Sequence, residues 1–230
     1  MSTVLVTGAN RGIGLALTTA YAERGDSVLA CCREPKAAVE LQALAQSHRV
    51  TVLALRVDDA ASVASLARQL SSATIDILIN NAGVSGGPLE SQTATAVDFG
   101  AWAHAFAVNT MGPVRVMHAF LPQLQRATSP KVMSITSQLG ALSLDLTLAY
   151  GYSATKAALN KFMRLAAIDL KSHGISIGVI HPGWVSTDMG GPGAEITPRT
   201  SAAGIVKVVD ELTLDTTGRF WKWNGGLHDW

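Results

Sequence analysis

Seven short apolar runs alternate along this chain with stretches whose apolar residues recur at helical spacing. Such alternation is typical of βαβ units with right-handed crossovers, which build a parallel sheet covered by helices on both faces. We therefore expect one α/β domain over residues 1–230, doubly wound and of Rossmann type, with a parallel sheet of about seven strands. The expected strands are Val4–Val6, Val28–Cys32, Val50–Leu55, Ile75–Ile79, Lys131–Ile135, Ile175–Ile180 and Gly218–Trp221, and the expected helices cover 13–24, 36–48, 60–73, 100–126, 152–173 and 199–212.

The composition and charge of the chain exclude several classes of protein. The chain is 48% hydrophobic and 15% charged, which is too apolar for disorder and suits a buried parallel sheet. Its formal net charge is +1, without a long basic run, so nucleic acid and anionic membranes are poor partners. No apolar stretch reaches the roughly 18 residues needed to span a bilayer. Cys31 and Cys32 are adjacent and fit reduced core thiols, so we expect a cytoplasmic protein.

Two motifs at the ends of expected strands predict a dinucleotide site. Gly8, Gly12 and Gly14 follow the first strand and open the first helix, where glycines let a pyrophosphate approach backbone amides. Their spacing differs from GxGxxG, and alone they also fit an ordinary tight turn. Asn80–Gly83 follows the fourth strand, at the edge where open parallel sheets bind ligands, although such asparagines also serve to join loops.

A tyrosine and a lysine four residues apart predict proton chemistry. Tyr152 and Lys156 would share a helix face, where an ammonium lowers a tyrosine pKa that is ordinarily about 10. Proton exchange with a substrate oxygen near neutral pH would follow. Ser137, just beyond the fifth strand, is placed to polarise a carbonyl. Tyr150 is excluded because Ala154 follows it at the same spacing, and an isolated Tyr–Lys pair usually marks only an exposed helix face.

In their order along the chain these motifs resemble the short-chain dehydrogenase/reductase family, over nearly the whole length. The family's motifs fall at Thr7–Gly14 (TGxxxGIG), Asn80–Gly83 (NNAG), Asn109, Ser137, Tyr152 with Lys156 (YxxxK), and Pro182–Thr187 (PG-x-V-x-T). The short length, the HPGWVSTDMGG segment and the ending from Gly218 most resemble the branch of C-factor and sniffer-type carbonyl reductases.

The resemblance implies an oxidoreductase that interconverts a small-molecule carbonyl and an alcohol by hydride transfer from NADP(H). Tyr152 would be the acid/base, Ser137 the carbonyl polariser, and Lys156 the pKa modulator and ribose ligand. Asn109 would organise a proton relay through a water on its backbone carbonyl. Pro113 has no N–H to occupy that carbonyl, although it also fits a simple helix kink.

NADP(H) is favoured over NAD(H) because Cys32 replaces the acid that NAD-binding members carry at the end of the second strand. Arg11 and Arg33 suit a 2′-phosphate, although either alone also fits an ordinary surface charge. Arg56 stands where the family has an adenine-contacting aspartate, in place of Asp58 or Asp59. The cofactor residues implied are Gly8, Asn10, Arg11, Gly12, Ile13, Gly14, Cys32, Arg33, Arg56, Val57, Asn81, Ala82, Gly83, Asn109, Tyr152, Lys156, Pro182, Gly183, Val185 and Thr187.

Substrate contacts are expected from Ser137, Leu139, Trp184 and Met189, with Val84, Ser85 and Gln138 nearby, and these residues suggest an apolar carbonyl compound. The glycine-rich stretch 184–197 is predicted to be a mobile lid, with a fixed surface loop as the alternative.

The helices at 100–126 and 152–173 have apolar faces broader than a surface helix needs, which predicts a homodimer or homotetramer through them. The histidines show no metal-ligand spacing, so we expect no metal. The rival hypothesis is a cofactor-binding signalling or regulatory protein with little turnover. The intact Ser–Tyr–Lys set argues against it.

Overall fold

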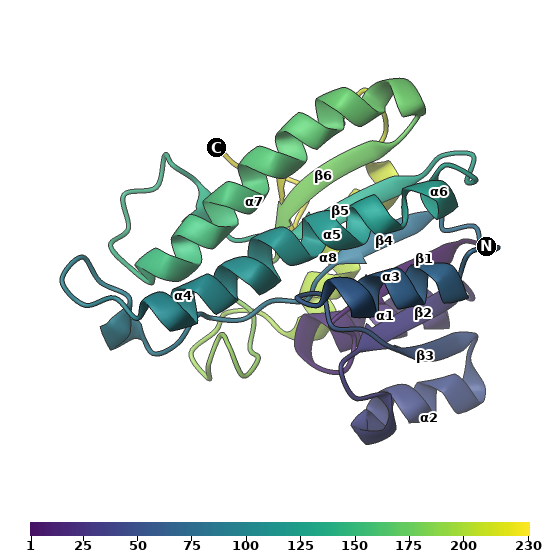
Figure 1. The fold of residues 1–230 in the computed structure, drawn as a ribbon, viewed down its shortest axis with the longest axis horizontal. Helices are drawn as coiled ribbons and strands as arrows, with labels where there is room; N and C mark the ends of the chain where they lie inside the picture. The colour runs from purple at the N-terminus through teal and green to yellow at the C-terminus, as the bar shows by residue number, and fades with distance from the viewer.

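The computed structural model describes all 230 residues and contains one seven-stranded parallel sheet with helices on both faces (Figure 1). The strands follow the order β3-β2-β1-β4-β5-β6-β7, so the chain winds outward from β1 twice, once in each direction. This arrangement confirms the expected doubly wound domain. The strands are β1 Thr3–Thr7, β2 Ser27–Cys32, β3 Val50–Ala54, β4 Ile77–Asn80, β5 Lys131–Ile135, β6 Ser176–His181 and β7 Phe220–Lys222.

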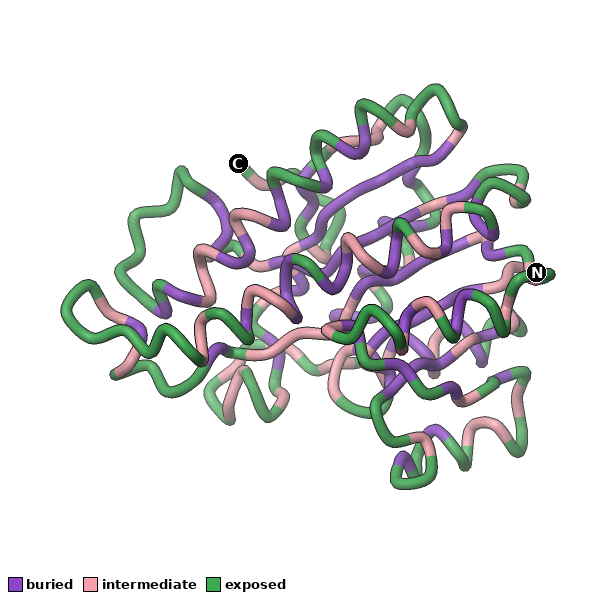
Figure 2. The backbone as a smooth tube through the Cα atoms, viewed as in Figure 1, coloured by how far each residue is buried: buried purple, intermediate pink, exposed green.

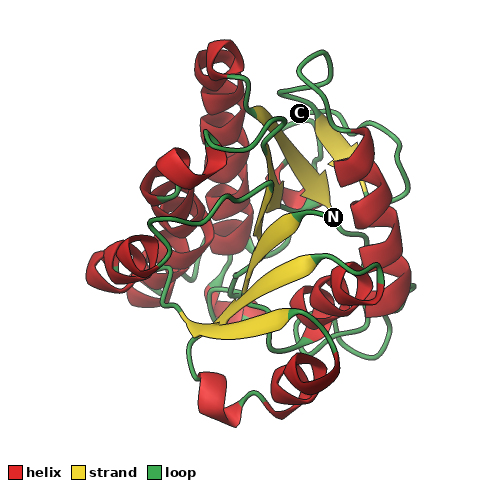
Figure 3. Cartoon of the chain, turned by 90° about the vertical axis from the view of Figure 1, so that its right-hand side faces the viewer, coloured by secondary structure: helices red, strands yellow, loops and turns green.

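Helices cover both faces of the sheet (Figure 3). An apolar core lies between the sheet and each of the two helical layers. Leu17, Leu41 and Ile205 belong to the core on one face, and Leu66, Phe120 and Leu159 to the core on the other. The first set comes from α1, α2 and α8, and the second from the layer of α3 to α7. The helices are α1 Gly12–Glu23, α2 Val39–Ser47, α3 Ala60–Gln69, α4 Phe99–Phe106, α5 Gly112–Ala119, α6 Leu121–Leu124, α7 Tyr150–Asp169 and α8 Pro198–Glu211.

Burial follows the strands, as a sheet covered on both faces requires. The central strands β4 and β5 are buried almost throughout, whereas the helices alternate buried and exposed residues (Figure 2). None of the helices combines the length and the apolar character that a membrane span requires.

The long helix expected at 100–126 is instead three helices, and the single-helix prediction is wrong. A π-helical turn, Ala107–Met111, separates α4 from α5, with Asn109 buried at its centre. Pro113 follows in the first turn of α5, and because it has no N–H it cannot make the regular bond to the Asn109 carbonyl. The break therefore lies where the proline predicts, and Pro122 similarly opens α6.

Candidate active site

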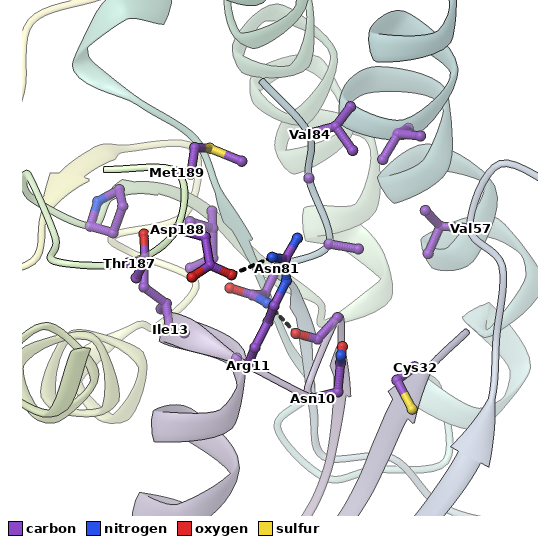
Figure 4. Close-up of a pocket in the computed structure, with 18 of the residues that line it drawn as sticks. Asn10, Arg11, Ile13, Cys32, Val57, Asn81, Val84, Thr187, Asp188 and Met189 are labelled. Atoms are coloured by element: carbon purple, nitrogen blue, oxygen red, sulfur yellow. Dashed lines mark hydrogen bonds and ion pairs between the residues drawn. The ribbon is translucent and has the colours of Figure 1, made fainter. Parts of the chain in front are cut away.

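A cavity of about 470 Å³ lies along the carboxyl ends of the strands. It extends from Cys32, the last residue of β2, past the glycine turn to Tyr152 and Lys156 on α7, and to Pro182 after β6. Figure 4 shows the part of the wall from Cys32 to Met189. The carboxyl ends of neighbouring parallel strands are where doubly wound sheets bind ligands, close to the point where the strand order reverses. In this fold that point lies between β1 and β4.

Most residues expected to bind the cofactor line this cavity. They are Gly8, Asn10, Arg11, Gly12, Ile13, Gly14, Cys32, Arg33, Arg56, Val57, Asn81, Ala82, Gly83, Tyr152, Lys156, Pro182 and Thr187. Asn109, Gly183 and Val185 are not on its wall. Asn109 and Val185 are buried, and Gly183 lines a neighbouring pocket of about 370 Å³ together with Gln138 and Trp184.

The glycine turn has the backbone geometry that its sequence predicts. Gly8 and Gly12 have φ values of 64° and 54°, in the left-handed region that favours glycine. A Cβ on Gly14 would overlap the carbonyl oxygen of Gly8. Helix α1 starts at Gly12 without a side-chain cap, so its first amides have no capping acceptor on the cavity side. Such a helix start is suited to a phosphate group.

Asn81 both lines the cavity and joins two loops. Its Nδ2 donates to the carbonyls of Thr7 at 2.9 Å and Gly8 at 3.0 Å, so it ties the β4 loop to the glycine turn. Asn81 therefore joins the loops, as the structural alternative predicts, while its contact with a cofactor stays a prediction.

Burial dominates the electrostatics of Tyr152 and Lys156. It raises the pKa of Tyr152 to about 12, while a hydrogen bond with Ser137 acts in the lowering direction. Burial lowers the pKa of Lys156 to about 8. The Lys156 Nζ donates to the Ile135 carbonyl at 2.8 Å and lies 5.7 Å from the centre of the Tyr152 ring. The net shift of the Tyr152 pKa is therefore upward, because the cost of removing the phenolate from water outweighs the neighbouring groups. A lowering contribution from Lys156 stays a prediction.

Asn109 connects two elements of the site through its side chain. Its Oδ1 accepts from the Val84 amide at 2.8 Å, and its Nδ2 donates to the Val84 carbonyl at 2.9 Å and to Thr155 Oγ1 at 3.1 Å. The loop after β4 is thereby fastened to α7.

Three arginines line the cavity, and they differ in their partners. Arg11 pairs with Asp188 at 2.5 Å, and the pair joins the glycine turn to the segment after β6 (Figure 4). Arg56 pairs with Asp58 at 3.3 Å, whereas Arg33 takes part in none of the four ion pairs in the structure. Arg33 is therefore the cation with the least competition for an incoming anion.

The expected substrate residues are dispersed. Met189 lines the main cavity and Trp184 the neighbouring pocket, while Ser137 and Leu139 are on neither wall. Ser137 Oγ accepts from the Leu139 amide at 3.2 Å, which leaves its hydroxyl proton available for donation. The segment 184–197 is closed at its base, since the Trp184 carbonyl accepts from the amides of Glu195 and Ile196.

Several cavity residues were not among the expected site residues. They are Leu55, Asp58, His104, Val108, Ile135, Thr136, Ser186, Asp188 and Pro198. Most of them adjoin a motif residue in the sequence, and that nearness could have predicted them. No such signal exists for His104, because only the packing of α4 brings it to the cavity wall. Thr136 is 1% exposed, and its hydroxyl has no hydrogen-bond partner.

The chain is similar in sequence and in fold to several known proteins. The family model for short chain dehydrogenases matches residues 2–195. The C-signal of Myxococcus xanthus is 38% identical over 167 residues, which are 72% of this chain and 99% of that protein. NADPH-bound carbonyl reductase from chicken fatty liver has a TM-score of 0.92 at 34% identity, covering 100% of this chain and 99% of that one. The carbonyl reductase Sniffer of D. melanogaster has a TM-score of 0.92 at 28% identity, with 100% of both chains covered.

The chain therefore belongs to the short-chain dehydrogenase/reductase family, and it is an oxidoreductase of that family. Its expected similarity to the C-factor and sniffer-type branch is confirmed by the C-signal and Sniffer matches.

Proposed function

We propose that this protein is an NADP(H)-dependent oxidoreductase that reduces a small, apolar aldehyde or ketone to an alcohol and also catalyses the reverse reaction. One observation carries the proposal: the same cavity contains the glycine turn, a free arginine and the Tyr152–Lys156 pair. A dinucleotide bound at the glycine turn would lie within reach of a proton donor. The carbonyl reductase with bound NADPH, which is similar over its whole length, supports this proposal.

The cavity residues fit the cofactor at several points. Side chains at positions 8 and 14 would collide with Ala82 and with the Gly8 carbonyl, so glycines keep this turn tight, and the first amides of α1 suit the pyrophosphate. Arg33 would bind the 2′-phosphate, and Lys156 the nicotinamide ribose. Thr136 offers an unpartnered buried hydroxyl on the cavity wall.

NADPH, when bound, would supply the hydride. Residues of the chain would donate the proton and replace it from solvent. Ser137 donates a hydrogen bond to the substrate carbonyl oxygen. Tyr152 gives that oxygen its proton as the alcohol forms, and its raised pKa keeps it protonated for this step at neutral pH. Lys156 and the backbone carbonyl of Asn109 would return a proton from solvent.

The test is the Tyr152→Phe variant, which removes one hydroxyl and keeps the ring. We expect it to bind NADPH like the wild type but to lose at least about 100-fold in kcat, the scale of a lost general acid. Cofactor binding is measured by NADPH fluorescence, and turnover by NADPH oxidation with a panel of aldehydes and ketones. Unchanged turnover would remove Tyr152 from the mechanism.

The similarity to C-signal over 72% of the chain favours a second candidate, a cofactor-binding signalling protein with little turnover. The same carbonyl panel separates the two. NADPH binding by the wild type without oxidation of NADPH by any member of the panel would favour the signalling role.

A further inference from the structure

Helix α7, which carries Tyr152, begins without a capping side chain of its own. The preceding residue, Ala149, has a φ of 48° and is the only non-glycine residue with positive φ. Its methyl group accepts no hydrogen bond. The first amides of a helix need acceptors from elsewhere, and Tyr152, as the third residue of α7, carries one of these amides.

Gln92, 60 residues earlier in the chain, supplies the missing acceptors. Its side-chain Oε1 accepts from the Tyr152 amide at 2.9 Å, and its backbone carbonyl accepts from the Tyr150 amide at 3.1 Å. Gln92 thus occupies the role that a capping side chain at position 149 would normally have.

The other end of the same side chain fastens the loop after β4. Gln92 Nε2 donates to the carbonyls of Ser85 at 3.0 Å and Gly87 at 2.9 Å. Because the oxygen faces an N–H and the nitrogen faces two carbonyls, the orientation of the amide is fixed. The residue is only 4% exposed, so water does not substitute for these contacts.

We infer that Gln92 is a positioning residue for the reaction: it holds the first turn of α7, and so places the Tyr152 hydroxyl against Ser137 and the substrate oxygen. This inference rests on the proposed function. Displacement of a catalytic group by about 1 Å costs on the order of 100-fold in rate. The contribution of Gln92 should therefore be seen in kcat more than in cofactor affinity.

The experiment compares Gln92→Met with a matched control, Gln123→Met. Gln123 is also buried, at 3% exposure, and donates to the carbonyls of Ala67 and Leu70, away from the cavity. We expect Gln92→Met to lose about 10- to 100-fold in kcat, with little change in the Kd for NADPH. The control should lose thermal stability and keep its kcat. Rates are expressed per NADPH-binding site, so partial unfolding does not imitate a catalytic loss.

The pH profile separates positioning from simple support of the fold. A displaced Tyr152 loses the Ser137 hydrogen bond, which acts to lower its pKa, so the pKa rises further. Alcohol oxidation needs the phenolate, so its rate increases with pH. We expect this increase to occur at higher pH in Gln92→Met than in the wild type, and at the wild-type pH in the control. A wild-type kcat and pH profile in Gln92→Met would overturn the inference.

If Gln92→Met does not fold, Gln92→Asn keeps a polar amide but is one methylene too short to span from the loop carbonyls to the Tyr152 amide. We expect it to lose kcat as well, and a wild-type kcat in it would also overturn the inference. The two proposals fail differently. An active Tyr152→Phe variant rejects the proposed mechanism, whereas an inactive one together with a fully active Gln92→Met variant rejects only the role of Gln92.

Discussion

Lys156 is buried and Tyr152 is half-buried on the cavity wall, and burial shifts the pKa of each group toward its uncharged form. With a pKa of about 12, Tyr152 is a phenol at neutral pH and is ready to donate a proton. Lys156, with a pKa of about 8, is still mostly an ammonium there. Reduction of a carbonyl uses the phenol, whereas oxidation of an alcohol uses the phenolate. In the proposed mechanism, the free enzyme is therefore set for reduction, and oxidation improves as the pH rises.

We propose that a preference for NADPH over NADH rests mainly on Arg33, which takes part in none of the four ion pairs. We expect Arg33→Ala to weaken NADPH binding by about 10- to 100-fold, the scale of a lost charged hydrogen bond, and NADH binding much less, because only NADPH has the 2′-phosphate. Arg11→Ala should show the same preference to a smaller degree, because Asp188 already engages that guanidinium.

Fluorescence titration with both cofactors measures this effect, and Arg68→Ala, an exposed position outside the cavity, is the control. Equal losses for NADPH and NADH in Arg33→Ala would refute the assignment.

Short sequence patterns predicted the residues that belong to motifs. They did not predict residues whose place in the site depends on partners far away in the sequence. The glycine turn, Ser137 and the Tyr152–Lys156 pair can be read from spacing, because each lies at the end of a strand or on one helix face. The pairing of Arg11 with Asp188 spans 177 positions. The direction of the pKa shift of Tyr152 depends on the burial of its side chain. Burial results from the packing of the whole chain and cannot be inferred from a short stretch of sequence.

Among the elements, prolines and glycines predicted breaks better than the apolar pattern did. Apolar residues continue through 100–126, and that continuity suggested one helix. Pro113 and Pro122 mark where the structure starts new helices at α5 and α6. The strand predictions were off by one or two residues at their ends, as for Ile75–Ile79 against the observed Ile77–Asn80. Hydrogen bonds between strands set those limits, and the sequence does not display them.

The segment 184–197 is predicted to close over the cofactor. Its base is held by the Trp184 hydrogen bonds and by a bridge between Val185 and Ile196, while Asp188 and Met189 are exposed on the cavity side. We expect amides near Gly190–Gly193 to gain hydrogen-exchange protection when NADPH binds, and α2, away from the cavity, to stay unchanged. Protection that does not change in this segment would favour the fixed-loop alternative.

For the molecule as a whole, the alternation of strand and helix patterns was sufficient to predict the architecture. Each crossover places a helix on one face of the sheet, and two windings in opposite directions produce the two separate cores. The order of strands and helices was therefore sufficient to predict the fold class, and the exact ends of these elements were not required.

An apolar strip remains exposed on α7, at Phe162, Leu165 and Ile168, which are 44%, 48% and 67% exposed. We propose that it is covered by a second copy of the chain, in a dimer or tetramer. A Phe162→Glu, Ile168→Glu double variant should shift the protein to monomer in analytical ultracentrifugation, because it buries charge in that contact. Val39→Glu is the control, because Val39 is also an exposed apolar residue but lies on α2. A monomeric wild type would contradict the proposal.

The ion pair between Arg11 and Asp188 also bears on how long a dinucleotide stays bound. Its side chains are 62% and 77% exposed, and ion pairs so open to water contribute at most about 1 kcal/mol. Thermal fluctuation is sufficient to part them, and added salt weakens them further. We therefore expect any closure of the segment 184–197 to be driven by the bound cofactor, and the residence time of the cofactor to depend on its phosphate and ribose contacts rather than on this ion pair.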